Sequence, residues 1–243
     1  MARELFSLNP LLDPAALAEQ FKRDGRVQVR DVLTQAAATA VHEILARATP
    51  WGLAWQAGSD GPHAIRATEL AADPAGEQRK IASAVTAAAR RGDYAVQFAQ
   101  YPILDAYLGG WAPGGPHDLL LEHLNTEDFL GFIREVTGIP EIRKGDAQAT
   151  LYAPGHFLGL HTDSHVGEGW RVAYVFNFCR EEWRPEWGGY LNFYDDEGDI
   201  VAGYRPRFNA LNLFSVPRAH AVSYVPPFAP IGRFAVTGWF RDR

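Results

Sequence analysis

The sequence predicts an α+β fold in which helices, formed mainly by the first 140 residues, support a β core. Segments with helical start and stop signals occupy the first part of the chain. From residue 145 onward the chain changes to short alternating segments broken by Gly, Pro, Asn and Asp, which favours a sandwich or a barrel. No internal repeat, low-complexity tract or linker interrupts the 243 residues, so we expect one domain over residues 1–243.

The N-terminal helices are expected from capping residues and helix breakers. Asp13 is suited to cap the first helix, with Pro14 at its first helical position. Thr34 opens an Ala-rich helix that ends before Pro50. Helices are therefore expected at residues 13–21, 34–47, 74–91 and 126–137, and strands at residues 26–30 and 94–98.

Two stretches rich in Gly and Pro are expected to be loops. Residues 51–73 also contain several aromatic side chains, and residues 109–116 hold a dense Gly/Pro cluster. The second loop has two interpretations, a mobile flap or a simple surface connection.

The β core is expected to contain short strands with one polar and one apolar face. In the last strand one face carries Arg233, Ala235 and Thr237, whereas the other face is bulky and apolar. We expect the apolar faces to pack under helices and the polar faces to line a cavity, because an unpaired guanidinium in a dry core is costly. Strands are expected at residues 147–152, 157–163, 170–178, 190–194, 208–214, 219–225 and 233–241.

Charge and cysteine content exclude several classes of protein. The formal net charge of −6 provides no general attraction to nucleic acid or anionic lipid. Cys179 is the only cysteine, which excludes an internal disulfide and a cysteine-based zinc site. No apolar run has signal-peptide or membrane-spanning character, so the sequence predicts a soluble cytoplasmic protein without a membrane or nucleic-acid partner.

A candidate metal site lies near the middle of the chain. In an extended segment His161 and Asp163 project from the same face, two residues apart. A third ligand is available in His220, 57 residues after Asp163. Two histidines and one carboxylate form the facial ligand set of Fe(II) oxygenases. Taken alone, either histidine is better explained as a structural, surface or capping residue, and it is their shared context that favours a metal site.

A candidate binding site for an anion accompanies the metal site. Arg233 offers a planar bidentate fork for a carboxylate, and Thr237 lies on the same strand face. The competing interpretation of Arg233 is a salt bridge at the surface. Tyr152 and Asn177 also project from faces suited to a cavity, although Tyr152 is equally natural as a packing residue.

The combined motifs resemble a known family. His161-X-Asp163, the distant His220 and residues 232–240 (GRFAVTGWF) are similar to 2-oxoglutarate/Fe(II)-dependent dioxygenases of the prolyl-hydroxylase type. Residues 183–193 (WRPEWGGYLNF) are similar to the connection between the two metal-ligand segments of that family. The resemblance covers residues 145–243 and implies a double-stranded β-helix, a jelly-roll, cupin-like core with supporting N-terminal helices.

The resemblance also implies residue roles and cofactors. His161, Asp163 and His220 would hold Fe(II) as the catalytic metal centre. Arg233 would bind the distal carboxylate of the co-substrate 2-oxoglutarate; the residues implied to assist it in the co-substrate pocket are Thr237, Tyr152 and Asn177. Ascorbate is expected as a supporting reductant.

Three functions follow from the resemblance. The first is hydroxylation of a prolyl residue in a protein substrate. The second keeps the same chemistry but acts on a free amino acid or small metabolite. The third is a sensor that binds metal and 2-oxoglutarate without turnover.

Overall fold

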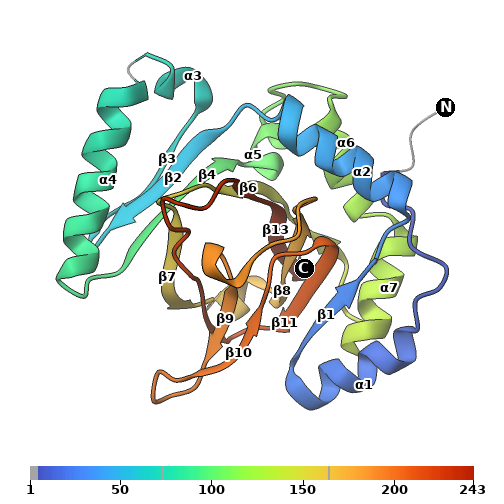
Figure 1. Ribbon diagram of the computed structural model, residues 1–243. Coiled ribbons are helices and arrows are strands. Elements are labelled where there is room, and N and C mark those ends of the chain that lie inside the picture. The colour runs from blue at the N-terminus through green and yellow to red at the C-terminus, as the bar shows by residue number, and fades with distance from the viewer. Residues whose placement is uncertain (1–4, 73, 164) are drawn as a thin grey trace.

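The computed structural model describes residues 5–72, 74–163 and 165–243. Its described strands form one antiparallel sheet of 13 strands that curls into a nearly closed barrel (Figure 1). The strands are β1 (Arg26–Arg30), β2 (Gly52–Ala57), β3 (Asp60–Ile65), β4 (Ala95–Tyr101), β5 (Lys144–Gly145), β6 (Gln148–Tyr152), β7 (Phe157–Thr162), β8 (Trp170–Phe178), β9 (Leu191–Tyr194), β10 (Ile200–Tyr204), β11 (Phe208–Ser215), β12 (Ala219–Val222) and β13 (Arg233–Arg241).

The order of the strands explains how the barrel closes. One wall runs β1-β11-β8-β13-β6 and the other runs β7-β12-β9-β10, and β4 pairs with both β6 and β7. Strands β1 and β10 lie at the two ends of this order. This arrangement confirms the predicted double-stranded β-helix core with helices around it.

The helices cover the outside of the barrel. Asp13 caps α1, and its side chain accepts a hydrogen bond from the Ala16 amide, as the capping pattern predicts. Thr34 caps α2 in the same way. The helices are α1 (Pro14–Asp24), α2 (Gln35–Glu43), the π-helical turn η1 (Ile44–Ala48), α3 (Ala67–Leu70), α4 (Pro74–Arg90), α5 (Ile103–Leu108), α6 (Pro116–Leu124) and α7 (Glu127–Thr137), with 3₁₀ turns η2 (His165–Glu168) and η3 (Pro185–Trp187).

The prediction of a loop at residues 51–73 is wrong. Residues 52–70 of this stretch form the hairpin β2–β3 followed by α3, and β2 pairs along its length with β4, whereas Asp73 lies outside the described residues. The hairpin extends the sheet at the left of Figure 1, where α4 packs against it. The Gly, Pro and aromatic content suggested a loop. The segment is extended instead because β4, which is distant in sequence, supplies the hydrogen bonds that hold it in a sheet.

Other elements were also missed. The short helices α5 and α6 flank the predicted loop at 109–116, and β5 and β10 add to the sheet. Trp111 of this loop lies under the Arg66 guanidinium, 3.6 Å from its ring centroid. Residues of the loop line a groove outside the barrel and are absent from the lining of the central cavity.

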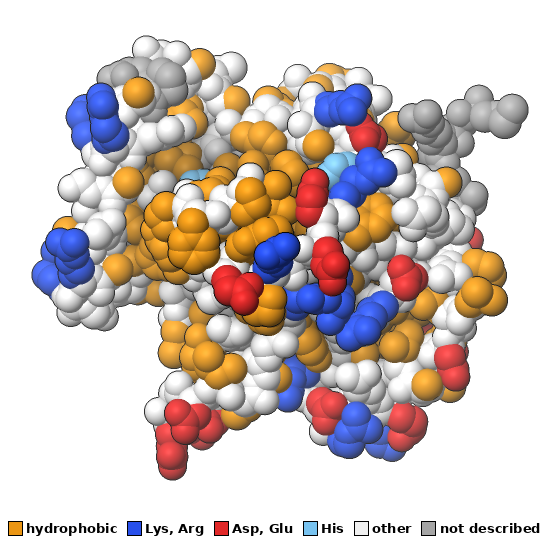
Figure 2. Space-filling view, in the orientation of Figure 1, with side chains coloured by type: hydrophobic (Ala, Val, Ile, Leu, Met, Phe, Trp, Pro, Cys, Tyr) orange, Lys and Arg blue, Asp and Glu red, His pale blue; other side chains and the backbone are white. Residues whose placement is uncertain are grey.

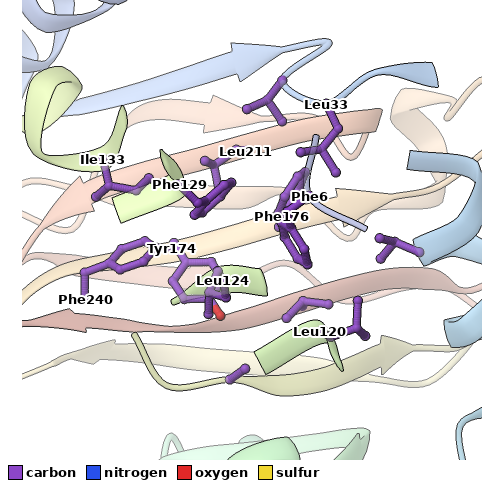
Figure 3. Packing of buried hydrophobic residues seen from close by; sticks show 14 of the residues in the cluster. Phe6, Leu33, Leu120, Leu124, Phe129, Ile133, Tyr174, Phe176, Leu211 and Phe240 are labelled. Carbon is purple, nitrogen blue, oxygen red and sulfur yellow. The ribbon is translucent and has the colours of Figure 1, made fainter. Parts of the chain in front are cut away.

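The main core lies between the sheet and the helices. Figure 3 shows Phe176 of β8, Leu211 of β11 and Phe240 of β13 directed toward Phe129 and Ile133 of α7. Alternate residues of β8, from Val172 to Phe178, are buried in this layer together with Val236 and Phe240 of β13, so the prediction that the bulky faces pack under helices is confirmed. Within the described part of the chain, each helix is either too short or too polar to cross a lipid bilayer.

His117 joins α6 to the end of η1 and generates a prediction about stability. Its Nε2 lies 2.9 Å from the Thr49 hydroxyl, which donates to the Ile44 carbonyl. Burial lowers the pKa of His117 to about 4. The unfolded chain therefore binds more protons than the folded chain between about pH 6.5 and 4, so this residue makes the free energy of unfolding fall as the pH falls through that window.

The free energy of unfolding should fall for both proteins between pH 7 and about pH 4.5. We expect the fall to be about 2 kcal/mol smaller for H117Q than for the wild type, because glutamine cannot be protonated. Urea unfolding at the two pH values measures this difference. Parallel pH dependence of the two proteins would show that His117 does not contribute.

Candidate active site

The barrel encloses a cavity of about 600 Å³. Strands from both walls line it, including the predicted polar faces of β8 and β13, which contribute Ala173, Val175, Arg233 and Thr237. The cavity therefore lies on the side of these strands opposite the main core, as the alternation of the sequence predicts.

The structure brings the three predicted metal ligands together inside this cavity. Antiparallel pairing of β7 with β12 places His220 directly opposite His161. The ring centroids lie 4.1 Å apart, and the nearest Nε2-to-carboxylate distances to Asp163 are 3.6 Å for His161 and 3.8 Å for His220. One ligand atom from each residue lies within 4.8 Å of the other two. The spacing allows all three to contact one ion.

Backbone contacts prepare both imidazoles as ligands. The Nδ1 atom of His161 lies 3.0 Å from the Gly159 carbonyl, and that of His220 lies 2.9 Å from the Arg218 carbonyl. Each carbonyl holds the proton on Nδ1, which leaves the Nε2 lone pair for a metal. Burial, reinforced by the neighbouring His161, lowers the pKa of His220 to about 4, so His220 is neutral near pH 7.

Asp163 is oriented by a tryptophan. Its carboxylate is 8% exposed, and its Oδ2 accepts a hydrogen bond of 2.9 Å from the indole Nε1 of Trp239. Trp239 stacks on Trp170, with ring centroids 3.9 Å apart. The donor set, two imidazoles and a buried carboxylate held by one outer donor, fits a facial Fe(II) site.

Arg233 lies at the wall of the same cavity and is 1% exposed. Its Nε donates to the Asn177 side-chain oxygen and its Nη1 to the Gly189 carbonyl, each at 3.0 Å. Among the described residues no carboxylate forms an ion pair with it, so the alternative of a surface salt bridge is wrong. Burial lowers the pKa of this guanidinium, which indicates that a bound anion would stabilise its charge.

The other predicted site residues surround Arg233. Asn177 is fully buried and fixes the guanidinium as just described. The Tyr152 ring lies 5.3 Å from the guanidinium carbon, stacks on Phe98 and lines the cavity, and burial raises the pKa of its phenol. Thr237 lines the cavity four residues along β13 from Arg233. The structure thus gathers all seven predicted residues at one site.

Two groups of cavity residues were not expected from the sequence. Tyr94 precedes β4, and its ring lies 6.3 Å from that of His161 in an edge-on arrangement. Trp55 and His63, stacked on each other at 4.3 Å, belong to the β2–β3 hairpin and line the cavity together with Gln56. Trp239 is a further cavity residue, and the sequence could have indicated it, because it shares the strand face of Arg233 and Thr237.

Comparison with known proteins supports the expected relationship. Residues 147–241 match the family model described as the 2OG-Fe(II) oxygenase superfamily. The resemblance to prolyl-hydroxylase-type dioxygenases that the motifs predicted is thereby confirmed for residues 147–241. No curated protein matches the chain.

Solved structures share the fold at low sequence identity. A prolyl-4-hydroxylase from Pseudomonas putida aligns with 20% identity and a TM-score of 0.56, covering 95% of this chain and all of that one. A prolyl hydroxylase from Trichoplax adhaerens, in complex with a peptide fragment of a hypoxia-inducible factor, aligns with 15% identity and a TM-score of 0.52, covering 94% and 89%. The epimerase SnoN from nogalamycin biosynthesis, which depends on α-ketoglutarate, aligns with 14% identity and a TM-score of 0.56, covering 95% and 84%.

The contact between Trp239 and Asp163 generates a prediction about metal affinity. We expect W239F, which keeps an aromatic ring against Trp170 but removes the indole donor, to bind Fe(II) or Mn(II) about 10-fold more weakly or worse, because residues that orient a ligand typically contribute this much. Anaerobic metal titration measures the effect. W187F, which changes a ring with no contact to Asp163, should bind metal like the wild type; equal affinity of W239F would contradict the assigned role.

Proposed function

Because residues 147–241 carry the 2OG-Fe(II) oxygenase family match, we propose that this protein is a 2-oxoglutarate- and O₂-dependent Fe(II) hydroxylase that acts on a prolyl residue of a protein. We further propose that residues 1–243 act as one domain, in which the helices and the β2–β3 hairpin support the barrel and its site.

One observation carries the proposal. A potential metal site of two histidines and one aspartate shares a cavity with a buried guanidinium that has no carboxylate partner among the described residues. A metal ion alone would not require the guanidinium, and an anion alone would not require the three ligands. A diacid that contacts the metal at one end and the guanidinium at the other accounts for both.

His161, Asp163 and His220 would hold the iron in this proposal. Fe(II), when bound, supplies the O₂ and one-electron chemistry that no amino-acid side chain provides. Three protein ligands of this kind would leave coordination positions open for further ligands, as in other facial sites.

Arg233 would seat the distal carboxylate of 2-oxoglutarate. Asn177 and the Gly189 carbonyl occupy its Nε and Nη1 donors and hold the guanidinium in place. Tyr152 supports it from one side, and its phenol, neutral because burial raises its pKa, can donate a hydrogen bond to the same carboxylate. Thr237 adds a hydroxyl on the same wall. Apolar residues such as Phe98 and Leu158 limit access of water to this end of the cavity.

A protein substrate is favoured by the composition of the β2–β3 hairpin. Trp55 and His63 give this hairpin an aromatic surface where it lines the cavity. Aromatic surfaces are well suited to contact prolyl segments. The Trichoplax adhaerens enzyme of the same fold is described in complex with a peptide.

A small-molecule substrate remains the second candidate. The cavity of about 600 Å³ falls within the range of sites for small ligands. SnoN, of the same fold, is an epimerase from a biosynthetic route. A third candidate, a sensor without turnover, would bind metal and 2-oxoglutarate but form no succinate.

Turnover of the co-substrate tests the proposed chemistry. We expect the wild type, supplied with Fe(II), ascorbate, O₂ and 2-oxoglutarate, to release succinate, and H161A and D163A to release none because each lacks a metal ligand. Succinate formation is measured with peptide and amino-acid pools. Absence of succinate above background with every pool, despite metal and 2-oxoglutarate binding, would favour the sensor.

Arg233 has a separable prediction. We expect R233Q to raise the KM for 2-oxoglutarate by about 30-fold or more, because deleting one partner of a desolvated charge pair costs about 2–5 kcal/mol. Metal affinity should stay within about 3-fold of the wild type, which also shows that the variant folds. A KM for 2-oxoglutarate equal to that of the wild type would remove Arg233 from the co-substrate site.

Product analysis separates the two substrate classes. Incubation with the protein and the metabolite fractions of a cell extract should add the mass of one oxygen atom to a prolyl residue of a protein. Mass spectrometry of both fractions measures it. An oxygen atom gained only by a metabolite would replace the first candidate by the second.

A further inference from the structure

A second polar groove lies at the seam where the two walls of the barrel end. It has a volume of about 610 Å³ and lies between β1 of one wall and β10 of the other. We call it the arginine seam. Its lining consists of Gln20, Gln28, Arg30, Tyr190, Gly203, Tyr204, Arg205 and Arg207.

The charge of the arginine seam is strongly one-sided. Among the described residues, three arginines line it and no aspartate or glutamate does, although the whole protein has a net charge of −6. In the part of the chain that the structure describes, none of the three forms a salt bridge. Burial lowers the pKa of Arg207, and the guanidiniums of Arg30 and Arg205 lower it further. Neighbouring guanidinium groups repel one another and destabilise the folded protein unless a bound anion bridges them.

Hydrogen bonds hold two of the three arginines, Arg205 and Arg207, in place. The Arg207 Nε donates to the Gln28 side-chain oxygen at 3.1 Å, and the Gln28 amide donates to the buried Asn212 at 2.9 Å. The Arg205 Nη1 donates to the Trp183 carbonyl at 3.2 Å. The Arg205 Nε is buried, and no described protein atom accepts its hydrogen bond. The seam thus has oriented donors, and one of them has no acceptor within the described chain.

Donors from three guanidiniums in one groove match an anion with several oxygens. Guanidinium groups bind phosphate oxygens in pairs, and the groove is also lined by Gln20, Tyr190 and Tyr204, whose side chains carry hydrogen-bond donors. We propose that the arginine seam binds a small phosphate-bearing anion, such as inorganic phosphate or a phosphomonoester.

Size and surrounding charge favour a small anion over a nucleic acid. Figure 2 shows Lys and Arg side chains gathering near the centre of this face, in the region where Figure 1 draws β9, β10 and β1, with Asp and Glu side chains around them. An adjoining groove shares the three arginines but also contains Asp31, Glu181 and Glu182. These acidic residues would repel a polyanion that extends beyond the seam.

The arginine seam is separate from the proposed active site. No residue that the structure describes lines both this groove and the cavity that contains His161 and Arg233. The proposal therefore does not depend on hydroxylase activity and holds or fails independently of it.

Calorimetric titration with inorganic phosphate tests the proposal. It is carried out at constant ionic strength and with saturating 2-oxoglutarate, so that Arg233 is already occupied if the proposed function is correct. We expect saturable binding of one phosphate by the wild type. R207Q should weaken it at least 10-fold, and R30Q, a change at an exposed side chain that leaves the core intact, should weaken it several-fold. R207K keeps the positive charge but loses the paired N–H donors of the guanidinium, so its affinity for phosphate should lie between those of R207Q and the wild type.

R79Q, which removes one exposed arginine from α4 far from the seam, is the matched control and should bind phosphate like the wild type. Absence of saturable phosphate binding by the wild type would overturn the proposal. Equal affinity of R30Q and R207Q with the wild type would also overturn it. The same titration is repeated with a 5′-mononucleotide and with a single-stranded RNA decamer. Binding of the mononucleotide supports a phosphomonoester site. Binding of the decamer alone would replace the proposal by a nucleic-acid-binding surface.

Discussion

The antiparallel register of β7 against β12 is the constraint on which the site depends. It sets His161 opposite His220 although 58 residues separate them, and Asp163 follows immediately at the end of β7. Because strand side chains alternate with a period of two, a slip of one residue would turn one imidazole out of the cavity. The neighbouring pairs, β12 with β9 and β7 with β4, fix that register from both sides.

The last strand completes the site from the opposite wall. Arg233, Thr237 and Trp239 all project from one face of β13, so a single strand provides the guanidinium, a hydroxyl and the indole that orients Asp163. Its central position, between β8 and β6, holds these side chains on a rigid element. The buried guanidinium is tolerated because Asn177 and the Gly189 carbonyl satisfy part of its hydrogen-bonding capacity.

Sequence reasoning succeeded where local patterns decide the structure. Alternation along β8 and β13 predicted which face lines the cavity, and the capping residues Asp13 and Thr34 located two helices. It failed where a distant partner decides. The β2–β3 hairpin is extended because β4 pairs with it, and the spacing of Trp55 or His63 in the sequence does not show that they reach the cavity. Likewise, Arg30 and Arg207 meet only because β1 pairs with β11.

An incompletely closed barrel leaves two strand edges, and their chemistry affects how molecules meet in solution. Within the described chain, β1 pairs only with β11 and β10 only with β9, so each has one edge without a strand partner. An edge of this kind invites a strand of another molecule to add to the sheet. The arginines at the β1 edge would bring like charges together in such a contact, and so oppose aggregation at the place where the barrel is open.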